Sequence, residues 1–307
     1  MDLKNKYLPV LDGFVGLVDF MGVDADIERA ARTSYGKDEL EPKETGRLIN
    51  YLTKHQHGTP SEMVIAKFHI ACPIFVMRQL IRHRVLSVNE FSGRYTECPD
   101  KFYLPEAFRA QSKTNKQGSE GTLEINKDEV ADHYKASYEL YKKLLGQGVS
   151  KELARIVLPL SLYTYFYVEC DLRNWFHFIS LRSDSHAQHE IQVYSDAIGK
   201  FLKQLFPKSF EAFLNYKFNS RSFTWKEIQF LQDMAYLLPT NSTTNLPEII
   251  KTKSELAKVN ERSKIWSTDR EIDDFIKNIT FVPNDGRFDL NNDNLKEASY
   301  FKEQNNV

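Results

Sequence analysis

The sequence predicts an α/β fold for residues 1–216 and a helical C-terminal extension for residues 217–307. In the first part, apolar residues recur in turn with the spacing of strands and the spacing of helices. In the second part, Thr224-x-x-Glu227 and Thr268-x-x-Glu271 resemble capping boxes that begin short helices. The tail after Pro283 is rich in Asn and Asp, so we expect it to be disordered.

Strand and helix patterns follow one another in the first part. Residues 12–20 and 63–72 have the pattern of strands, and residues 160–168 form the aromatic, apolar run of a buried strand. Apolar residues at helical spacing predict helices over these ranges: 24–34, 44–54, 73–81, 130–145 and 187–205. Residues 109–128 are polar and rich in Gly and Ser, so we expect a mobile loop there.

The composition is that of an ordinary globular protein. Of 307 residues, 41% are hydrophobic and 27% are charged, and the formal net charge is -1. A net charge so near zero provides no long-range field for nucleic acid or for an anionic membrane. The three cysteines, Cys72, Cys98 and Cys170, are too few and too scattered for a disulfide framework or a zinc site. We therefore expect no bound metal.

The sequence shows no sign of export or of membrane insertion. Its first residues, MDLKNKYLPVLDGF, carry charges where a signal peptide has an apolar core. No apolar run approaches the length of a membrane span. We therefore expect a cytoplasmic protein that binds neither membrane nor nucleic acid.

The segment from Gln79 to Tyr95 concentrates the polar chemistry. It reads QLIRHRVLSVNEFSGRY and combines arginines with a histidine, an acid, amides and hydroxyls. Arginine suits phosphate oxygens because the planar guanidinium makes two parallel, charge-assisted hydrogen bonds. Ser92 and Gly93 add a hydroxyl and an unhindered backbone N–H. Composition alone fits equally well a basic, solvent-exposed connection.

The order of the residues is more specific than their composition. Arg82-His83-Arg84, followed after residues 85–91 by Ser92, resembles the signature of the flavin-dependent thymidylate synthases, the ThyX family. Three more segments are similar to that family and stand in the same order: HGTPSE at 57–62, ARIVLP at 154–159 and LRSDSHAQ at 181–188. The resemblance covers about residues 12–216. The sequence has no G-x-G-x-x-G motif, so it does not support a Rossmann type of flavin site.

The resemblance implies a fold, a reaction and an assembly. The fold is a ThyX-like mixed sheet flanked by helices, with residues 1–216 as the catalytic domain. The reaction is the methylation of dUMP to dTMP, in which 5,10-methylenetetrahydrofolate gives the carbon and FAD, reduced by NADPH, gives the hydride. The assembly is a homotetramer whose subunits share active sites.

The resemblance also implies site residues. Arg182, at the end of an aromatic helix, is expected to be catalytic, because a fixed positive charge against the uracil ring activates its C5 atom. The family's dUMP-binding positions correspond to Gln79, Arg82, Glu90, Ser92, Gly93, Arg94, Arg155 and Arg182. Its FAD-binding positions correspond to His57, Thr59, Arg82, His83, Arg84, Glu90, Asp171, Arg173 and His177.

Two of these positions depart from the family pattern, which often has Asn at both. A carboxylate at Asp171 only accepts hydrogen bonds, so the flavin contact is left open and the backbone is one alternative. His177 still donates and accepts, and its alternative is a histidine satisfied within the aromatic helix.

Two other functions compete with this interpretation. One is a catalytically silent nucleotide-binding or regulatory protein, and the retained Arg182 and the 57–62 segment argue against it. The other is RNA binding through the basic segment, which the near-neutral net charge disfavours. A colourless protein that binds no flavin would favour the first, and a salt-sensitive electrophoretic shift would favour the second.

Overall fold

The computed structural model describes residues 3–34, 36, 45–113, 115–237, 275, 278–279, 286–291 and 294–305. By its contacts, the chain divides into two compact units: residues 1–218 together with 286–307, and residues 219–285. The first unit holds the main sheet and all the candidate site residues. Within the second lies α9 (Trp225–Leu237), where Thr224 and Glu227 exchange the expected capping-box hydrogen bonds. The Thr268 box lies outside the described residues.

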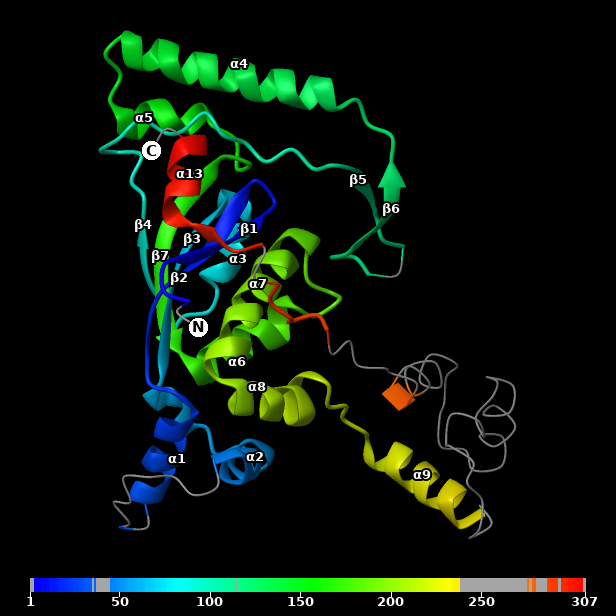
Figure 1. Ribbon diagram of the computed structural model, residues 1–307. Helices are drawn as coiled ribbons and strands as arrows, with labels where there is room; N and C mark the ends of the chain where they lie inside the picture. Colours follow the sequence, from blue (N-terminus) through cyan, green and yellow to red (C-terminus); the bar gives the residue numbers. More distant parts are fainter. Residues whose placement is uncertain are drawn as a thin grey trace. The chain divides into compact units, whose positions relative to one another are not determined.

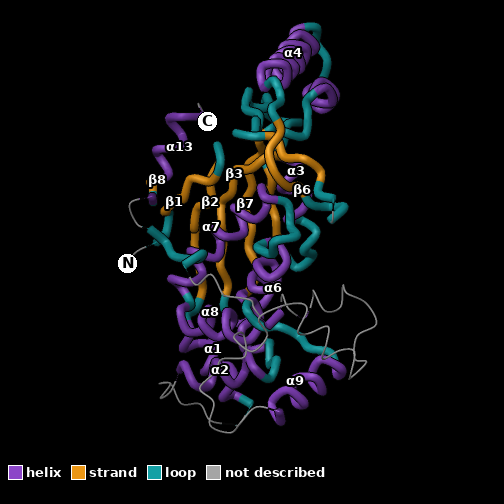
Figure 2. The backbone as a smooth tube through the Cα atoms, turned by 90° about the vertical axis from the view of Figure 1, so that its right-hand side faces the viewer, coloured by secondary structure: helices purple, strands orange, loops and turns teal. Residues whose placement is uncertain are grey.

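A six-stranded sheet in the order β4-β7-β3-β2-β1-β8 forms the centre of the first unit (Figure 2). The strands are β1 (Lys6–Val10), β2 (Gly13–Met21), β3 (Ile65–Pro73), β4 (Ser87–Glu90), β7 (Tyr163–Asp171) and β8 (Lys296–Glu297). The predicted α/β fold is confirmed, but each of these pairings is antiparallel, whereas we expected a mixed sheet. For β1 and β2 the cause is local, because Val10 pairs with Gly13 across a turn too tight for a parallel crossover.

Helices α6 and α7 cover one face of this sheet, and α1, α2 and α8 pack together beyond its end (Figures 1 and 2). The helices of the first unit are α1 (Asp24–Thr33), α2 (Thr45–Lys54), α3 (Ile74–Leu80), α4 (Lys127–Gly146), α5 (Lys151–Ala154), α6 (Leu172–Arg182), α7 (His189–Leu205), α8 (Pro207–Phe213) and α13 (Ala298–Asn305). The strands and helices predicted for residues 12–205 are thus confirmed, with boundaries that differ by a few residues.

The core lies between the sheet and α6 with α7. Phe68 of β3 and Trp175 of α6 are fully buried, with ring centroids 5.2 Å apart, and Trp175 Nε1 donates to the Ala66 carbonyl at 3.0 Å. The start of α6 is fixed by Asp171, whose carboxylate accepts from the Asn174 backbone N–H at 3.0 Å. This anchoring places Arg182, the last residue of α6, at a defined point beside the sheet.

The expected mobile loop at 109–128 is instead a β-hairpin, formed by β5 (Phe108–Gln111) and β6 (Ser119–Leu123). Its polar side chains bond the turn instead of water. The Gln111 amide donates to the carbonyls of Lys116 and Gly118 at 3.0 and 2.9 Å, and Glu120 accepts from the Lys113 backbone N–H at 2.9 Å. The polar composition therefore predicted a turn correctly but missed the two strands on either side of it.

The tail after Pro283, which we expected to be disordered, is ordered over residues 286–291 and 294–305. β8 pairs with β1 at the edge of the sheet. Phe288 is fully buried, and its ring lies so close to Gly199 of α7 that an added Cβ there would be 2.5 Å from it. Phe301 is also buried, so two aromatic side chains in a polar segment pack into cores of the first unit.

Candidate active site

The arginines of the signature lie in the turn between α3 and β4. α3 ends at Leu80, and β4 begins at Ser87. Within this turn Arg82 and Arg84 are exposed, whereas His83 is half-buried. Two exposed guanidinium groups beside a sheet edge suit the binding of an anion.

His83 contacts the end of α6. Arg182 Nε donates to His83 Nε2 at 3.2 Å, and the imidazole ring centroid lies 5.0 Å from that of Phe178 and 5.7 Å from that of His177. Burial, together with the charges of Arg182 and His177, lowers the pKa of His83 to about 4. The imidazole is therefore neutral at pH 7 and is able to accept the hydrogen bond from Arg182.

Positive charge is concentrated at this point. Burial, and secondly the charge of Arg82, lower the pKa of Arg182. Arginine keeps its charge at any ordinary pH, so the two guanidinium groups repel each other here. A bound anion, or a ring that develops negative charge, would relieve that repulsion.

A second group of predicted residues lies at the other end of β4. A Cβ on Gly93 would be 2.8 Å from Cys98 Sγ and 3.3 Å from Arg155 Cδ, so only glycine brings the chain this close to Arg155. Arg94 forms an ion pair with Glu152, with 3.2 Å between Nε and Oε2. Glu90 accepts from the Thr164 hydroxyl at 2.6 Å. The group therefore offers two guanidinium groups around the Ser92–Gly93 backbone.

A cavity of about 260 Å³ collects three of the predicted flavin-binding residues: His57, Arg173 and His177. Arg173 forms an ion pair with Glu62, and its guanidinium approaches Gly58 so closely that a Cβ there would be 2.6 Å from Nε. His57 also lines a neighbouring cavity of about 570 Å³ together with Thr59. His83 joins this region to Arg182, because its ring contacts that of His177.

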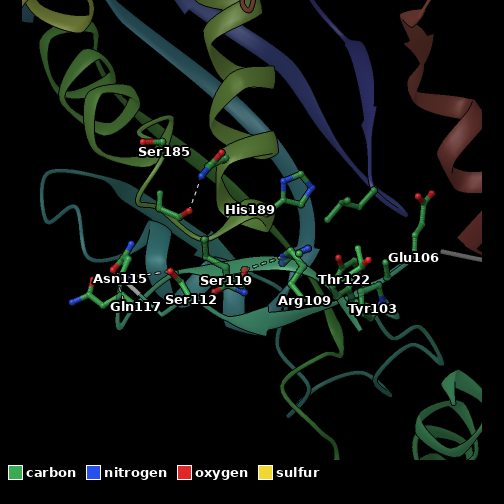
Figure 3. Close-up of a pocket in the computed structure, with 18 residues that line it drawn as sticks. Tyr103, Glu106, Arg109, Ser112, Asn115, Gln117, Ser119, Thr122, Ser185 and His189 are labelled. Carbon is green, nitrogen blue, oxygen red and sulfur yellow. Dashed lines mark hydrogen bonds between the residues drawn. The ribbon is translucent and has the colours of Figure 1, made fainter. Parts of the chain in front are cut away.

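A third, polar cavity of about 620 Å³ is lined by the β5–β6 hairpin and by the start of α7 (Figure 3). Gln188 lines it and accepts a hydrogen bond from Gln79, a predicted dUMP-binding residue, at 2.6 Å. Behind Gln188 lies Glu190, which is paired with Arg109 of the hairpin. Nothing in the sequence singled out Glu190 or Arg109. An acid in the first turn of a helix is a common partner of the helix dipole, and the partner of Glu190 lies 81 residues away.

The structure thus brings Arg182, His83, His177, His57 and Arg173 into one connected region and gathers Ser92, Gly93, Arg94 and Arg155 into another. Within the described residues, no group of three or more His, Cys, Asp or Glu side chains is placed to hold a metal ion. Nor does any helix in the described part of the chain have the length and apolarity needed to cross a membrane.

An antiparallel sheet with helices on one face, and with exposed arginines in the turn beside its β4 edge, defines this chain as an α/β protein. Residues 16–208 match the family described as thymidylate synthase complementing protein. A flavin-dependent thymidylate synthase of Thermus thermophilus is 50% identical over 210 residues, covering 67% of this chain and 77% of that one. The enzyme of the same name from Kosmotoga olearia is 46% identical over 214 residues, covering 67% and 92%.

Solved structures agree with the sequence relatives. The UMP/dUMP methylase PolB from Streptomyces cacaoi, bound with 5-Br dUMP, superposes with a TM-score of 0.62 at 34% identity. The match covers 67% of this chain and 97% of PolB. The chain belongs to the family of flavin-dependent thymidylate synthases.

Proposed function

We propose that this protein methylates dUMP to dTMP, with 5,10-methylenetetrahydrofolate as carbon donor and FAD, reduced by NADPH, as hydride source. The contact between Arg182 and His83 carries the proposal. The neutral His83 accepts a hydrogen bond from the guanidinium of Arg182 and so holds it at the end of α6. The charge of Arg82 acts on the same guanidinium. Such a fixed charge stabilises negative charge on the uracil ring as C5 becomes nucleophilic.

The residues around the 260 Å³ cavity fit a flavin. His57, Arg173 and His177 offer hydrogen-bond donors to the cavity, and Phe176 adds an apolar side chain to its lining. Gly58 leaves the backbone open next to Arg173, where a side chain would collide. When bound and reduced, FAD would supply the hydride, and cationic groups such as Arg84 would stabilise its negative charge. Thr59, Arg82, His83, Glu90 and Asp171 complete the set that we propose for the cofactor.

The second group of residues fits the nucleotide phosphate. Arg94 and Arg155 would neutralise it, while Ser92 and Gly93 would donate from a hydroxyl and a backbone N–H. The ion pair of Arg94 with Glu152 is half-exposed, so a phosphate could replace the carboxylate at little cost. Gln79, Arg82, Glu90 and Arg182 complete the proposed dUMP site.

The cysteines have no part in the proposed chemistry. Cys72, Cys98 and Cys170 are buried and unpaired. Burial raises the pKa of all three thiols, so none is ionised to a useful extent at pH 7. The uracil ring is therefore activated by the charge of Arg182, without a thiolate nucleophile.

The visible spectrum of the purified protein tests the proposal. We expect a yellow protein that releases FAD on denaturation, loses its colour with NADPH, and forms dTMP from dUMP and methylenetetrahydrofolate. A protein that cannot be loaded with FAD, or one that binds FAD and dUMP but forms no dTMP, would contradict it. The first result would favour a silent nucleotide-binding protein.

We further propose a cytoplasmic homotetramer with active sites shared between subunits. Two features support sharing: the family resemblance, and the separation of the two residue groups by β4 within one chain. The unpaired cysteines suit a reducing compartment. Light scattering tests the assembly, and a fully active monomer would exclude it.

A further inference from the structure

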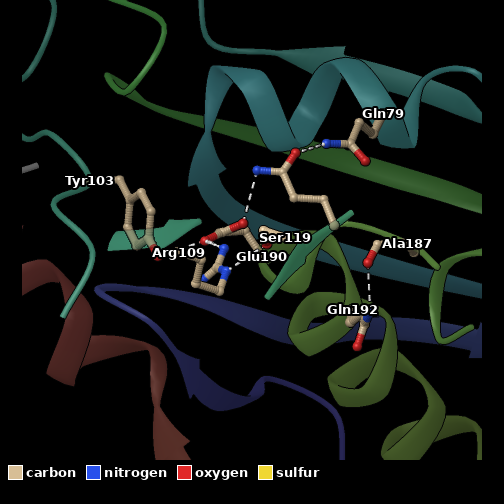
Figure 4. A network of polar contacts seen from close by, with 8 residues as sticks. Gln79, Tyr103, Arg109, Ser119, Ala187, Glu190 and Gln192 are labelled. Atoms are coloured by element: carbon tan, nitrogen blue, oxygen red, sulfur yellow. Dashed lines mark hydrogen bonds and ion pairs between the residues drawn. The ribbon is translucent and has the colours of Figure 1, made fainter. Parts of the chain in front are cut away.

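A buried carboxylate lies behind the proposed nucleotide site. Glu190, in the first turn of α7, is 2% exposed. It accepts hydrogen bonds from Tyr103 Oη at 3.0 Å, Arg109 Nη2 at 2.5 Å and Gln188 Nε2 at 2.8 Å (Figure 4). Burial acts to raise the pKa of Glu190, but the hydrogen bonds from Arg109 and Gln188 outweigh it, and the net shift is downward. The carboxylate is therefore ionised at pH 7 and accepts only.

This fixed acceptor sets the orientation of two amides in sequence. Because Glu190 cannot donate, Gln188 must turn its NH₂ group toward it, and its carbonyl oxygen then faces Gln79. Gln79 in turn must present its own NH₂ group, which donates to Gln188 Oε1 at 2.6 Å. The carbonyl oxygen of Gln79 is thereby the end of its amide turned away from Gln188.

We propose that Glu190 and Gln188 are positioning residues that hold the Gln79 amide so that its carbonyl oxygen accepts a hydrogen bond from the nucleotide. The proposal rests on the function proposed above, in which Gln79 belongs to the dUMP site. The donors available on dUMP are the N3–H of the uracil and the 3′-hydroxyl of the sugar. The hydrogen bonds that link Glu190, Gln188 and Gln79 thus decide which end of the Gln79 amide faces these nucleotide donors, its carbonyl oxygen or its NH₂ group.

Arg109 and Tyr103 hold the other oxygen of the carboxylate. Both donate to Oε1, whereas Gln188 donates to Oε2. Arg109 comes from β5, so the hairpin fixes the far end of the chain of hydrogen bonds. Its Nε is itself held by the Ser119 hydroxyl of β6 at 2.9 Å.

Gln188→Met breaks the chain while keeping side-chain volume. Gln188 is exposed and makes no cap hydrogen bond to α7, so the fold should tolerate the change. The Gln79 amide is then free to turn, and losing one oriented neutral hydrogen bond raises KM for dUMP by roughly threefold to tenfold. We expect kcat, FAD content and Tm to stay close to those of the wild type.

Gln192→Met is the matched control. Gln192 lies in the first turn of α7, four residues after Gln188, and lines the same cavity. Its amide, however, donates to the Ala187 carbonyl at 2.6 Å and takes no part in the hydrogen bonds that link Glu190 to Gln79. It should leave KM for dUMP unchanged. Equal effects of the two substitutions would overturn the proposal, because they would show a general response of the cavity wall.

Glu190→Gln gives an independent test, because it should reverse the chain. The new amide would turn its oxygen to Arg109 and Tyr103 and its NH₂ group to Gln188. Gln188 would then flip, and so would Gln79, which would present NH₂ to the nucleotide. We expect KM for dUMP to rise at least as much as in Gln188→Met, and the double variant Glu190→Gln/Gln188→Met to have the KM of Gln188→Met alone, because methionine cannot pass the reversal on to Gln79.

Gln79→Met, combined with Gln188→Met, gives a double-mutant cycle. If Gln188 acts through Gln79, the double variant Gln79→Met/Gln188→Met has the KM of Gln79→Met alone. Effects that multiply would overturn the proposal, as would a wild-type KM in Gln188→Met. A wild-type enzyme that forms no dTMP would instead refute the proposed function, so the two failures are distinguishable.

Discussion

Arg182 is the residue on which the proposed chemistry depends most directly. Its guanidinium is held by His83 at the end of α6, and Arg82 adds a second positive charge nearby. We predict that Arg182→Ala keeps FAD and is still reduced by NADPH, but that dTMP formation falls by about a hundredfold to a thousandfold. Arg182→Lys should recover only part of the activity, because a point charge cannot reproduce the planar fork.

The measurement is dTMP formed per bound flavin, made beside thermal denaturation. An arginine that merely ties α6 to the α3–β4 turn would behave differently. In that case Arg182→Ala would lower Tm, and the turnover of the folded fraction would equal that of the wild type.

The neutral state of His83 predicts a dependence of stability on pH. The pKa of His83 is about 4 in the folded protein, below the ordinary value of about 6.5 in an unfolded chain. Unfolding therefore takes up a proton between these values, so stability is complete above about pH 6.5 and is lost as the pH falls toward 4.

In His83→Gln, an uncharged amide oxygen replaces the imidazole acceptor, so we predict a shallower fall of Tm between pH 6.5 and pH 4. Burial also lowers the pKa of His69 to about 4, but His69 is present in both the wild type and His83→Gln. The difference between the two Tm curves therefore reports His83. Parallel curves would show that His83 is not held neutral.

For single residues, the sequence predicted candidates for the site but not their contacts. The resemblance of the signature to the flavin-dependent thymidylate synthases implies that Arg82, His83, Arg84 and Ser92 belong to the site. The contact of His83 with Arg182 could not be foreseen, because it joins residues 99 positions apart. The same holds for Glu190, whose significance arises only when the hairpin brings Arg109 against it.

Helix α6 is the element that carries Arg173, His177 and Arg182, and its first turn explains one departure from the family pattern. Both oxygens of Asp171 are used within the helix: Oδ1 accepts from the Asn174 backbone N–H at 3.0 Å, and Oδ2 accepts from the Asn174 amide at 2.7 Å. A carboxylate suits this position, because it also faces the positive end of the helix dipole.

We predict that Asp171→Ala lowers the free energy of unfolding by about 0.5–2 kcal/mol, the usual cost of a lost cap. Asp171→Asn should lose much less, since its amide oxygen still accepts from the backbone N–H. Because both carboxylate oxygens of Asp171 accept from Asn174, any contact of residue 171 with FAD is made by its backbone, which both variants keep. The folded fraction of both variants should therefore bind FAD with unchanged stoichiometry. Urea unfolding and flavin absorbance measure the two effects, and loss of FAD from a stable variant would assign the side chain to the flavin site.

Elements were predicted well where a periodic apolar pattern ran long enough to be distinctive. α7 has such a pattern, and it was predicted to end at the residue where it does end, before Pro207. β4 was missed because its four residues are all exposed and are held by pairing with β7, not by burial. The β5–β6 hairpin was missed because its order comes from side-chain bonds to its own turn.

For the molecule as a whole, the sequence predicted an α/β body over residues 1–216 and a helical extension with a disordered tail over residues 217–307. It did not predict that residues 286–305 belong to the first unit. Composition describes residues 286–305 as polar, and it does so correctly. It does not show that Phe288 and Phe301 enter cores of the first unit, because two aromatic residues in a polar segment fit a disordered tail equally well.

The final prediction concerns the tail that we expected to be disordered and that instead packs against the first unit. Phe288 is fully buried against Gly199, Phe210 and Phe218, and beside it Arg287 pairs with Asp196, with 2.9 Å between Nε and Oδ2. Phe288→Ala should lower the free energy of unfolding of the first unit by about 3–5 kcal/mol, through lost burial and the cavity that remains. Truncation after residue 285 should cost at least as much, because it also removes β8 and Phe301.

Tyr300→Ala is the control, since this side chain is 40% exposed. Its cost should be about 1 kcal/mol or less, as expected for a surface position. Because the residues proposed for the site all lie at or before residue 190, Phe288→Ala and the truncated protein should keep FAD and turnover at temperatures where they remain folded. Urea unfolding followed by tryptophan fluorescence, to which the buried Trp175 contributes, gives the stabilities. If truncation after residue 285 left the midpoint unchanged, the packing of Phe288 against α7 would contribute nothing to the fold, and the first unit would end at Phe218.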